Sequence, residues 1–160
     1  MSVGRFIAMV GMLVWRRSDG RYLLVRRSAS RDFAPGEWET GSGRLEQGEG
    51  RPDALRRERT EALGQDARSE CILGITHFYR GGSDPANEMV GVSFGCSVGD
   101  ASGLSLSEEH SEHRWVTAED AAAFLPPNHW LSALLVRAEA FRELMPEELR
   151  RLHWTGDIEF

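Results

Sequence analysis

The start of the chain consists of apolar runs separated by a short polar turn. Residues 6–15 (FIAMVGMLVW) and 22–25 (YLLV) are apolar, and residues 18–20 (SDG) between them are typical of a turn. The longer run is about half the ~20 residues that a membrane helix needs, and Arg16 and Arg17 follow it without a small-residue cleavage site. The pattern therefore predicts a β-hairpin whose first strand is buried.

The next stretch, residues 28–50, is rich in Gly, Ser and charged residues, with Trp38 in its middle. It shows no sustained helical or strand period, and loops of this length in a compact domain are often functional. Pro52 suits the first turn of a helix, and Gly64 suits the position just past its end. We therefore expect a long loop followed by a helix over residues 52–63.

Two further apolar segments, residues 72–79 and 89–98, predict strands on either side of the turn-forming residues 81–85 (GGSDP). Residues 114–116 (RWV) are a candidate for a third strand in this part of the chain. Strands mixed with helices, with no internal repeat and no linker, predict an α/β fold in which a sheet packs between helices. One domain over residues 1–160 is the simplest organisation.

Helices are predicted after these strands. Thr117, with Asp120 three residues on, can cap a short helix through Phe124, which residues 126–127 (PP) end. Apolar residues at helical spacing then predict a final amphipathic helix, and they are Leu131, Leu134, Leu135, Ala138 and Phe141.

Composition limits the class of partner. All 19 basic residues are Arg, Asp and Glu together number 25, and the formal net charge is -6 with no polybasic run. This balance argues against a nucleic-acid polymer or an anionic membrane as the main partner. An anionic small molecule is still allowed, because bound cations can dominate the field of a local site.

The two cysteines, Cys71 and Cys96, have neither metal-ligand spacing nor the density of a disulfide scaffold. We interpret them as small core residues in a protein of the reducing cytoplasm. Trp15 and Trp130 are likewise expected in the core.

The helix over residues 52–63 carries two acids on its apolar side. Glu58 and Glu61 lie about 60° apart around the helix, on the arc of Ala54, Leu55 and Ala62. A carboxylate there needs a cation or a hydrogen-bond donor, because burying an unpaired charge is expensive. A hard cation such as Mg²⁺ is one solution. Pairing with nearby arginines on a solvated surface is the other.

Read together with the loop before it, this helix resembles the Nudix box of the Nudix hydrolases, a family that includes MutT. The resemblance covers residues 43–64 (GRLEQGEGRPDALRRERTEALG). The residues at the spacing of the motif are Gly43, Glu49, Arg57, Glu58, Glu61 and Gly64. The order of strands and helices around the box is also similar to that of the family. The resemblance implies the Nudix fold, a mixed β-sheet sandwiched between α-helices.

The box departs from the family pattern at several positions. Arg59 and Gln65 replace aliphatic residues, and Ala62 replaces the second acid of a Glu-Glu pair. Because that acid is usually a principal metal ligand in the family, the chain is short of one carboxylate. Residues 40–43 (TGSG) stand where relatives commonly have an aliphatic residue, Pro and two glycines.

The resemblance also implies roles for residues of the box. Glu58 and Glu61 would bind Mg²⁺, or Mn²⁺ in its place, together with the backbone carbonyl of Ser42. Glu58 would also orient or deprotonate the attacking water. Arg57, a member of the catalytic group, would hold the loop to the helix through Glu49. Arg44 would lie near the substrate phosphates, and Glu46 occupies an acidic position of the same turn.

Further candidate site residues lie outside the box, in residues 107–115, at Arg27 and around Tyr79. Residues 107–115 (SEEHSEHRW) precede the strand that carries Trp115, and many relatives have an acidic loop there. Glu109 is our candidate for a further metal ligand and Glu112 for a catalytic residue, against the alternative of a solvated charged turn. Substrate-binding candidates are Arg27 and Tyr79, with His77 and Arg80 beside the latter.

Two functions follow from the resemblance. The first is a Mg²⁺-dependent hydrolase that cleaves a pyrophosphate bond in a nucleoside diphosphate linked to another group: a nucleoside triphosphate, an oxidised nucleotide, a dinucleotide or a nucleotide sugar. The second is a Nudix-fold nucleotide-binding module with weakened catalysis, which Ala62 and Arg59 favour. An isomerase on a related scaffold has little support. The expected partner is a small nucleotide, and a homodimer would be common among relatives.

We predict that Ala62→Glu strengthens metal binding, because position 62 follows Glu61 and lies one helical turn after Glu58. The variant should lower the Mg²⁺ concentration needed for half-maximal activity, measured by titration beside the native protein. Unchanged metal affinity in a correctly folded variant would show that position 62 does not face the cation.

Overall fold

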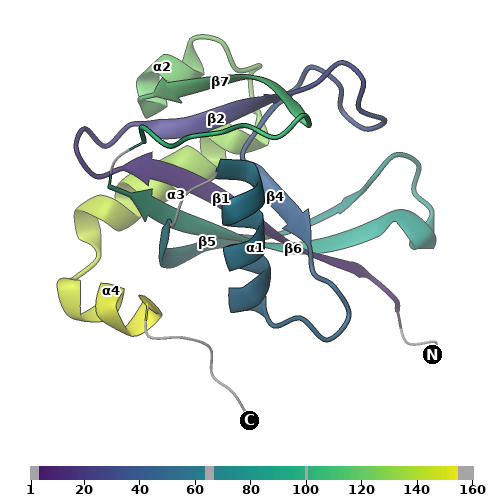
Figure 1. Ribbon diagram of the computed structural model, residues 1–160, viewed down its shortest axis with the longest axis horizontal. Coiled ribbons are helices and arrows are strands. Elements are labelled where there is room, and N and C mark those ends of the chain that lie inside the picture. Colours follow the sequence, from purple (N-terminus) through teal and green to yellow (C-terminus); the bar gives the residue numbers. More distant parts are fainter. Residues whose placement is uncertain (1–3, 64–66, 100, 155–160) are drawn as a thin grey trace.

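The computed structural model describes residues 4–63, 67–99 and 101–154 (Figure 1). The strands are β1 (Ile7–Arg16), β2 (Tyr22–Arg27), β3 (Trp38–Glu39), β4 (Gly41–Arg44), β5 (Arg68–Tyr79), β6 (Glu88–Val98) and β7 (His110–Val116). The helices are α1 (Arg51–Leu63), α2 (Ala118–Ala122), α3 (Trp130–Leu144) and α4 (Glu147–Trp154), and a 3-10 turn, η1 (Pro85–Asn87), precedes β6.

The sheet is mixed and is organised around β1. One side of β1 pairs along its whole length with parallel β6, from Ile7 opposite Met89 to Arg16 opposite Val98, and β5 lies antiparallel on β6. The other side of β1 is shared by two antiparallel strands. β4 pairs with the first half of β1 and β2 with its end, and β2 continues to β3 and β7. The sheet therefore forks at β1, and β4 and β2 diverge from it.

Alternation along β1 builds a core on each face of the sheet. Val10, Met12 and Val14 pack with Ala54 and Leu55 of α1. Leu13 and Trp15 belong to the opposite cluster, which includes buried residues of α2 and α3. Figure 1 shows α1 crossing one face of the sheet and α3 the other. The predicted fold class, a mixed sheet sandwiched between helices, is confirmed.

Several expected elements are confirmed, with changes in their extent. The helix over residues 52–63 is α1, and the hairpin is β1 and β2. Only two residue pairs join that hairpin, Val14 with Leu23 and Trp15 with Tyr22, because antiparallel β4 pairs with Met9–Met12 on the same side of β1. The third strand is longer than expected and begins at His110.

Other expectations were wrong. Residues 28–50 are not a loop throughout, because they contain β3 and β4, which are too short to show a strand period. Trp130 is not in the core: it is 48% exposed at the start of α3. Helix α4, which packs against β5, was not predicted.

Trp15 and both cysteines are buried as expected, and Cys71 and Cys96 are unpaired. Within the described residues, no helix is long and apolar enough to cross a lipid bilayer.

Candidate active site

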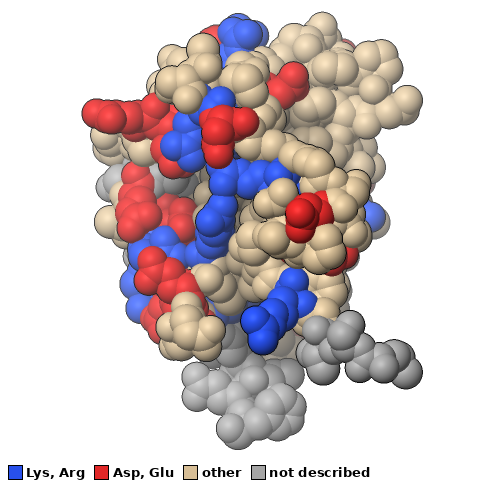
Figure 2. Space-filling view, turned by 90° about the vertical axis from the view of Figure 1, so that its right-hand side faces the viewer, with Lys and Arg blue, Asp and Glu red and all other residues tan. Residues whose placement is uncertain are grey.

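The fork in the sheet opens a cleft of about 1240 Å³. Its walls come from β4, from the exposed side of α1, from the segment between β2 and β3, and from the ends of β5 and β7. Figure 2 shows Arg side chains and acidic side chains interleaved on one face of the molecule rather than in separate patches. Among the described residues, most of the charged side chains that line the cleft are held in ion pairs.

Arg57 ties the loop before α1 to the helix. Its Nε and Nη2 donate to the two carboxylate oxygens of Glu49, both at 2.9 Å, and Nη2 also donates to the carbonyl of Arg44 at 2.9 Å. The backbone N–H of Glu46 donates to Glu49 as well. Hydrogen bonds from Arg57 and Glu46 lower the pKa of Glu49 to about 2, and Glu49 raises the pKa of Arg57. This forked pair fixes the loop in register with α1.

The same arginine also holds Glu58. Arg57 Nη1 donates to Glu58 Oε1 at 2.6 Å, and Glu58 is only 9% exposed. Burial raises the pKa of Glu58 against the opposing effect of Arg57, and the charges of Glu61 and Glu109 raise it further. A charged Glu58 is therefore unfavourable at this place, and a cation beside it would relieve the penalty.

The contact between position 43 and Glu58 explains why the box begins with a glycine. A Cβ built on Gly43 would lie 1.6 Å from Glu58 Oε1, a distance that no side chain could accept. The Glu58 carboxylate thus crosses directly over the backbone of β4. The absence of a side chain at position 43 places this carboxylate in the wall of the cleft.

The other proposed metal ligands line the same cleft as Glu58, but their oxygen atoms do not surround one common position. Glu61 also lines the cleft, and its side chain is 60% exposed and 3.5 Å from Arg57 Nη1. Ser42 lies on β4 opposite Gly11 and lines the cleft too. Glu109 lines it from the start of β7, where Arg31 holds its carboxylate. In the part of the chain that the structure describes, no three His, Cys, Asp or Glu side chains form a metal-binding group.

The donor set nevertheless fits a hard divalent cation. Mg²⁺ is commonly held by one or two carboxylates together with substrate phosphates. Glu58 and Glu61 are oxygen donors one turn apart on a rigid helix, and Glu58 is destabilised as a bare anion. Position 62, the site of the missing acid, has a side chain outside the described part of the structure.

The structure brings some of the predicted substrate and catalytic residues into the cleft. Arg44 lines it and, among the described residues, makes no ion pair. Arg27 also lines it, but its guanidinium is committed to Glu39 at 2.9 Å and to the carbonyl of Phe33 at 2.8 Å. Arg27 is therefore placed to shape the cleft wall rather than to contact a ligand.

Two predicted site residues lie outside the cleft lining. The Tyr79 hydroxyl donates to Glu88 at 3.1 Å, and neither residue is among those that line the cleft. Glu112 pairs with Arg114 at 2.8 Å and with Arg26 at 3.6 Å. The geometry therefore does not favour Glu112 as a water-activating residue or Tyr79 as a substrate ligand.

Sequence reasoning missed an aromatic and histidine-containing part of the cleft. Phe33 stacks on Phe78, with ring centroids 6.3 Å apart, and Trp130 stacks on His129. His110 is nearly buried and hydrogen-bonds Glu39 at 3.0 Å through Nε2. These residues come from four separate segments and form no local pattern. No sequence signal could have found them, because tertiary packing alone brings these segments together and leaves Trp130 exposed.

Comparison with known proteins identifies the class. Residues 6–138 match the NUDIX domain family. The nucleoside triphosphatase NudI of Escherichia fergusonii is 31% identical over 115 residues, which cover 68% of this chain and 81% of the relative. The chain therefore belongs to the Nudix family. It is a Nudix-type pyrophosphohydrolase, a class that generally uses divalent metal ions.

Solved structures agree on the fold. The MutT protein of Methanosarcina mazei Go1 superposes with a TM-score of 0.71 at 22% identity, over 89% of this chain and 99% of that one. The Ap4A hydrolase of C. elegans, in a binary complex, gives a TM-score of 0.67 at 19% identity, over 85% of this chain and 97% of that one.

We predict that Gly43→Ala lowers turnover about 100-fold, because the new methyl group must displace the Glu58 carboxylate and small misplacements at a reacting centre are costly. Gly50→Ala is the matched control, since its Cβ would meet Pro52 at an ordinary 3.6 Å. Steady-state kinetics on both variants checks this. Equal activity of the two would show that Glu58 need not lie over Gly43.

Proposed function

We propose that this protein hydrolyses a pyrophosphate bond in a nucleoside diphosphate linked to another group, with Mg²⁺ as its working cation and Mn²⁺ as a substitute. The observation that carries the proposal is Glu58, a buried carboxylate held over Gly43 by Arg57 in the wall of a large cleft. A cation-binding acid at such a place suits chemistry on phosphoryl groups.

Each residue of the site has a part that follows from its position. Glu58, Glu61 and the carbonyl of Ser42 would hold the cation. When bound, Mg²⁺ would neutralise charge on the phosphoryl oxygens and make a water molecule more nucleophilic. Glu58 would also orient that water and accept its proton, because its carboxylate lies in the cleft wall at the proposed cation site. Arg44, which lines the cleft, would bind a phosphate oxygen.

The aromatic part of the cleft supports a nucleoside at the other end of the substrate. Phe33, Phe78 and Trp130 provide apolar ring surface in the same cleft as the acids. A base can stack on such surface while its phosphates reach Arg44. The similar protein NudI is named a nucleoside triphosphatase, and the C. elegans neighbour is an Ap4A hydrolase. We therefore place nucleoside triphosphates first and dinucleotides second among the candidate substrates.

Ala62 favours a second function, a nucleotide-binding module with weakened catalysis. The cleft and the Arg57 network would serve binding equally well. A hydrolase and a binding module would differ in the rate of turnover and not in the affinity for nucleotide. A cytoplasmic location and a homodimer remain predictions from the sequence.

A product-resolved screen of nucleoside triphosphates, dinucleotides and nucleotide sugars, with Mg²⁺ and with Mn²⁺, tests the proposal. We expect cleavage between phosphates, lost on addition of excess chelator. Tight nucleotide binding without turnover would favour the binding module. Turnover that persists in excess chelator would contradict the metal-dependent site.

We predict that Glu58→Gln lowers kcat by about two orders of magnitude, in the range typical of losing a positioned acid-base group. The same substitution should leave the midpoint of thermal unfolding unchanged or raised in metal-free buffer. Because burial raises the pKa of Glu58, stability falls as the carboxyl ionises with rising pH, and the neutral amide avoids this. Glu119→Gln, at an exposed position on α2, is the control. A kcat loss below about threefold would show that another residue acts as the general base.

A further inference from the structure

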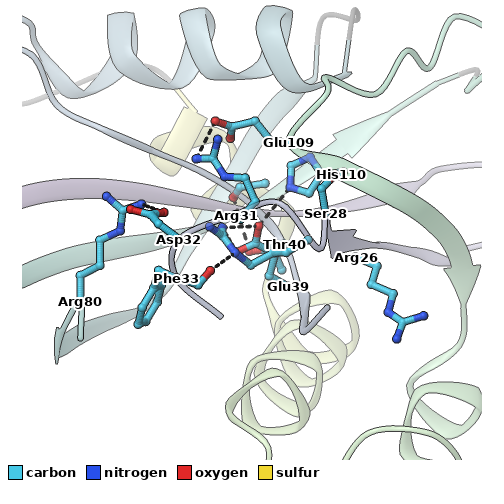
Figure 3. Close-up of polar contacts among 12 residues, drawn as sticks. Arg26, Ser28, Arg31, Asp32, Phe33, Glu39, Thr40, Arg80, Glu109 and His110 are labelled. Carbon is cyan, nitrogen blue, oxygen red and sulfur yellow. Dashed lines mark hydrogen bonds and ion pairs between the residues drawn. The ribbon is translucent and has the colours of Figure 1, made fainter. Parts of the chain in front are cut away.

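The segment between β2 and β3 contributes an arginine that holds an acid of the proposed metal site. Arg31 Nη2 lies 2.9 Å from Glu109 Oε1 (Figure 3). Both residues line the cleft. Arg31 Nε is shielded from water and has no hydrogen-bond partner. The guanidinium therefore uses only part of its donor fork on Glu109.

The backbone that carries this pair is fixed on both sides. The N–H of Ser28 donates to the carbonyl of Glu109 at 2.8 Å, and the Ser28 hydroxyl donates to the carbonyl of Glu108 at 2.9 Å. On the other side of Arg31, the carbonyl of Phe33 accepts from Arg27 Nε at 2.8 Å. With the main chain anchored in this way, a change of partner requires side-chain rotation alone.

The pair itself is easy to exchange. The side chains of Arg31 and Glu109 are 32% and 47% exposed, and ion pairs with that much solvent around them contribute little stability. The other arginines near the acids are held more firmly. Arg57 makes a two-pronged pair with Glu49, and Arg27 is 11% exposed beside Glu39. Arg31 is thus the paired arginine of the cleft most available to a ligand.

Glu109 lines the same cleft as Glu58 and Glu61, so three carboxylates face one cleft. Arg57 pairs with Glu58 and Glu61, and Arg31 pairs with Glu109. A divalent cation offers all three a better partner. Once Glu109 leaves it, Arg31 has an unpaired charge that faces the cleft.

We propose that Arg31 and Glu109 exchange partners when the site is loaded: Glu109 turns to the divalent cation, and Arg31 takes a substrate phosphate in place of the carboxylate. The proposal rests on the proposed function and adds a phosphate-binding residue to it. A phosphate oxygen pair matches the guanidinium fork, including the unpartnered Nε, better than one carboxylate oxygen does. Arg31 then links the binding of substrate to the assembly of the cation ligands.

The first experiment measures Mn²⁺ binding by calorimetry, without substrate. Arg31→Gln should bind Mn²⁺ about three- to fivefold more tightly, because Glu109 no longer has a competing partner. Removing any nearby positive charge also favours a cation, so two controls are needed. Arg26→Gln removes an arginine that lies outside the cleft lining and pairs with Glu112, and it should change the affinity less than twofold. Arg31→Gln in a Glu109→Gln background should also change it less than twofold.

The second experiment measures binding of inorganic pyrophosphate to the Mn²⁺-saturated protein. Arg31→Gln should weaken it about tenfold or more, in the range of charged hydrogen bonds. Arg31→Lys, which keeps the charge and loses the fork, should fall between native protein and Arg31→Gln. Arg26→Gln is the control, because Arg26 lies outside the cleft lining and points away from this cluster in Figure 3.

The outcomes separate this proposal from the proposed function. A native protein that binds neither Mn²⁺ nor pyrophosphate would overturn both. If it binds both ligands, an Arg31→Gln variant with unchanged affinities would overturn the exchange alone. If Arg31→Gln raises the Mn²⁺ affinity equally in the native and the Glu109→Gln background, the exchange is also overturned. The gain would then come from the loss of a positive charge and not from the release of Glu109. Tighter Mn²⁺ binding that requires Glu109, together with weaker pyrophosphate binding, supports the exchange whether or not turnover is found.

Discussion

The guanidinium group of Arg57 joins the loop before α1 to α1 itself, through Glu49, the carbonyl of Arg44 and Glu58. These contacts set the position of β4 against the helix, and Gly43 lets the Glu58 carboxylate pass over that strand. Removing Arg57 would leave Glu49 and Glu58 unpaired with little exposure to water, which is strongly unfavourable. The cleft wall that carries the chemistry therefore depends on this one side chain.

Pairs of acids and arginines also shape the rest of the cleft, and these pairs differ in strength. Glu49 and Arg57 are locked and shape the wall, whereas Arg31 and Glu109 are solvated and free to change partner. Glu58 lies between these extremes, since burial opposes its charge more than Arg57 supports it. The pairs therefore range from fixed, at Arg57 and Glu49, to exchangeable, at Arg31 and Glu109. Such a range makes the site rigid around Arg57 and adaptable around Arg31.

The sequence predicted the parts of this structure that depend on local pattern. Pro52 and Gly64 predicted the helix, and the resemblance to the Nudix box implied the contact between Arg57 and Glu49. The sequence could not place β3 and β4, which are held by long-range pairing and are too short for a period. Trp130 was assigned to the core from its residue type, and only tertiary packing shows it exposed. Glu112 and Tyr79 lie outside the cleft lining, and the sequence pattern could not show which side chains face the cleft.

We propose that Glu58, a buried carboxylate, is destabilised as an anion until a divalent cation binds beside it. The most direct measurement is an NMR titration of the Glu58 carboxyl carbon, with and without Mg²⁺. We expect its pKa to lie above the usual range for Glu without the cation, because burial dominates, and to fall when Mg²⁺ is added. The same pKa in both conditions would show that the cation does not bind beside Glu58.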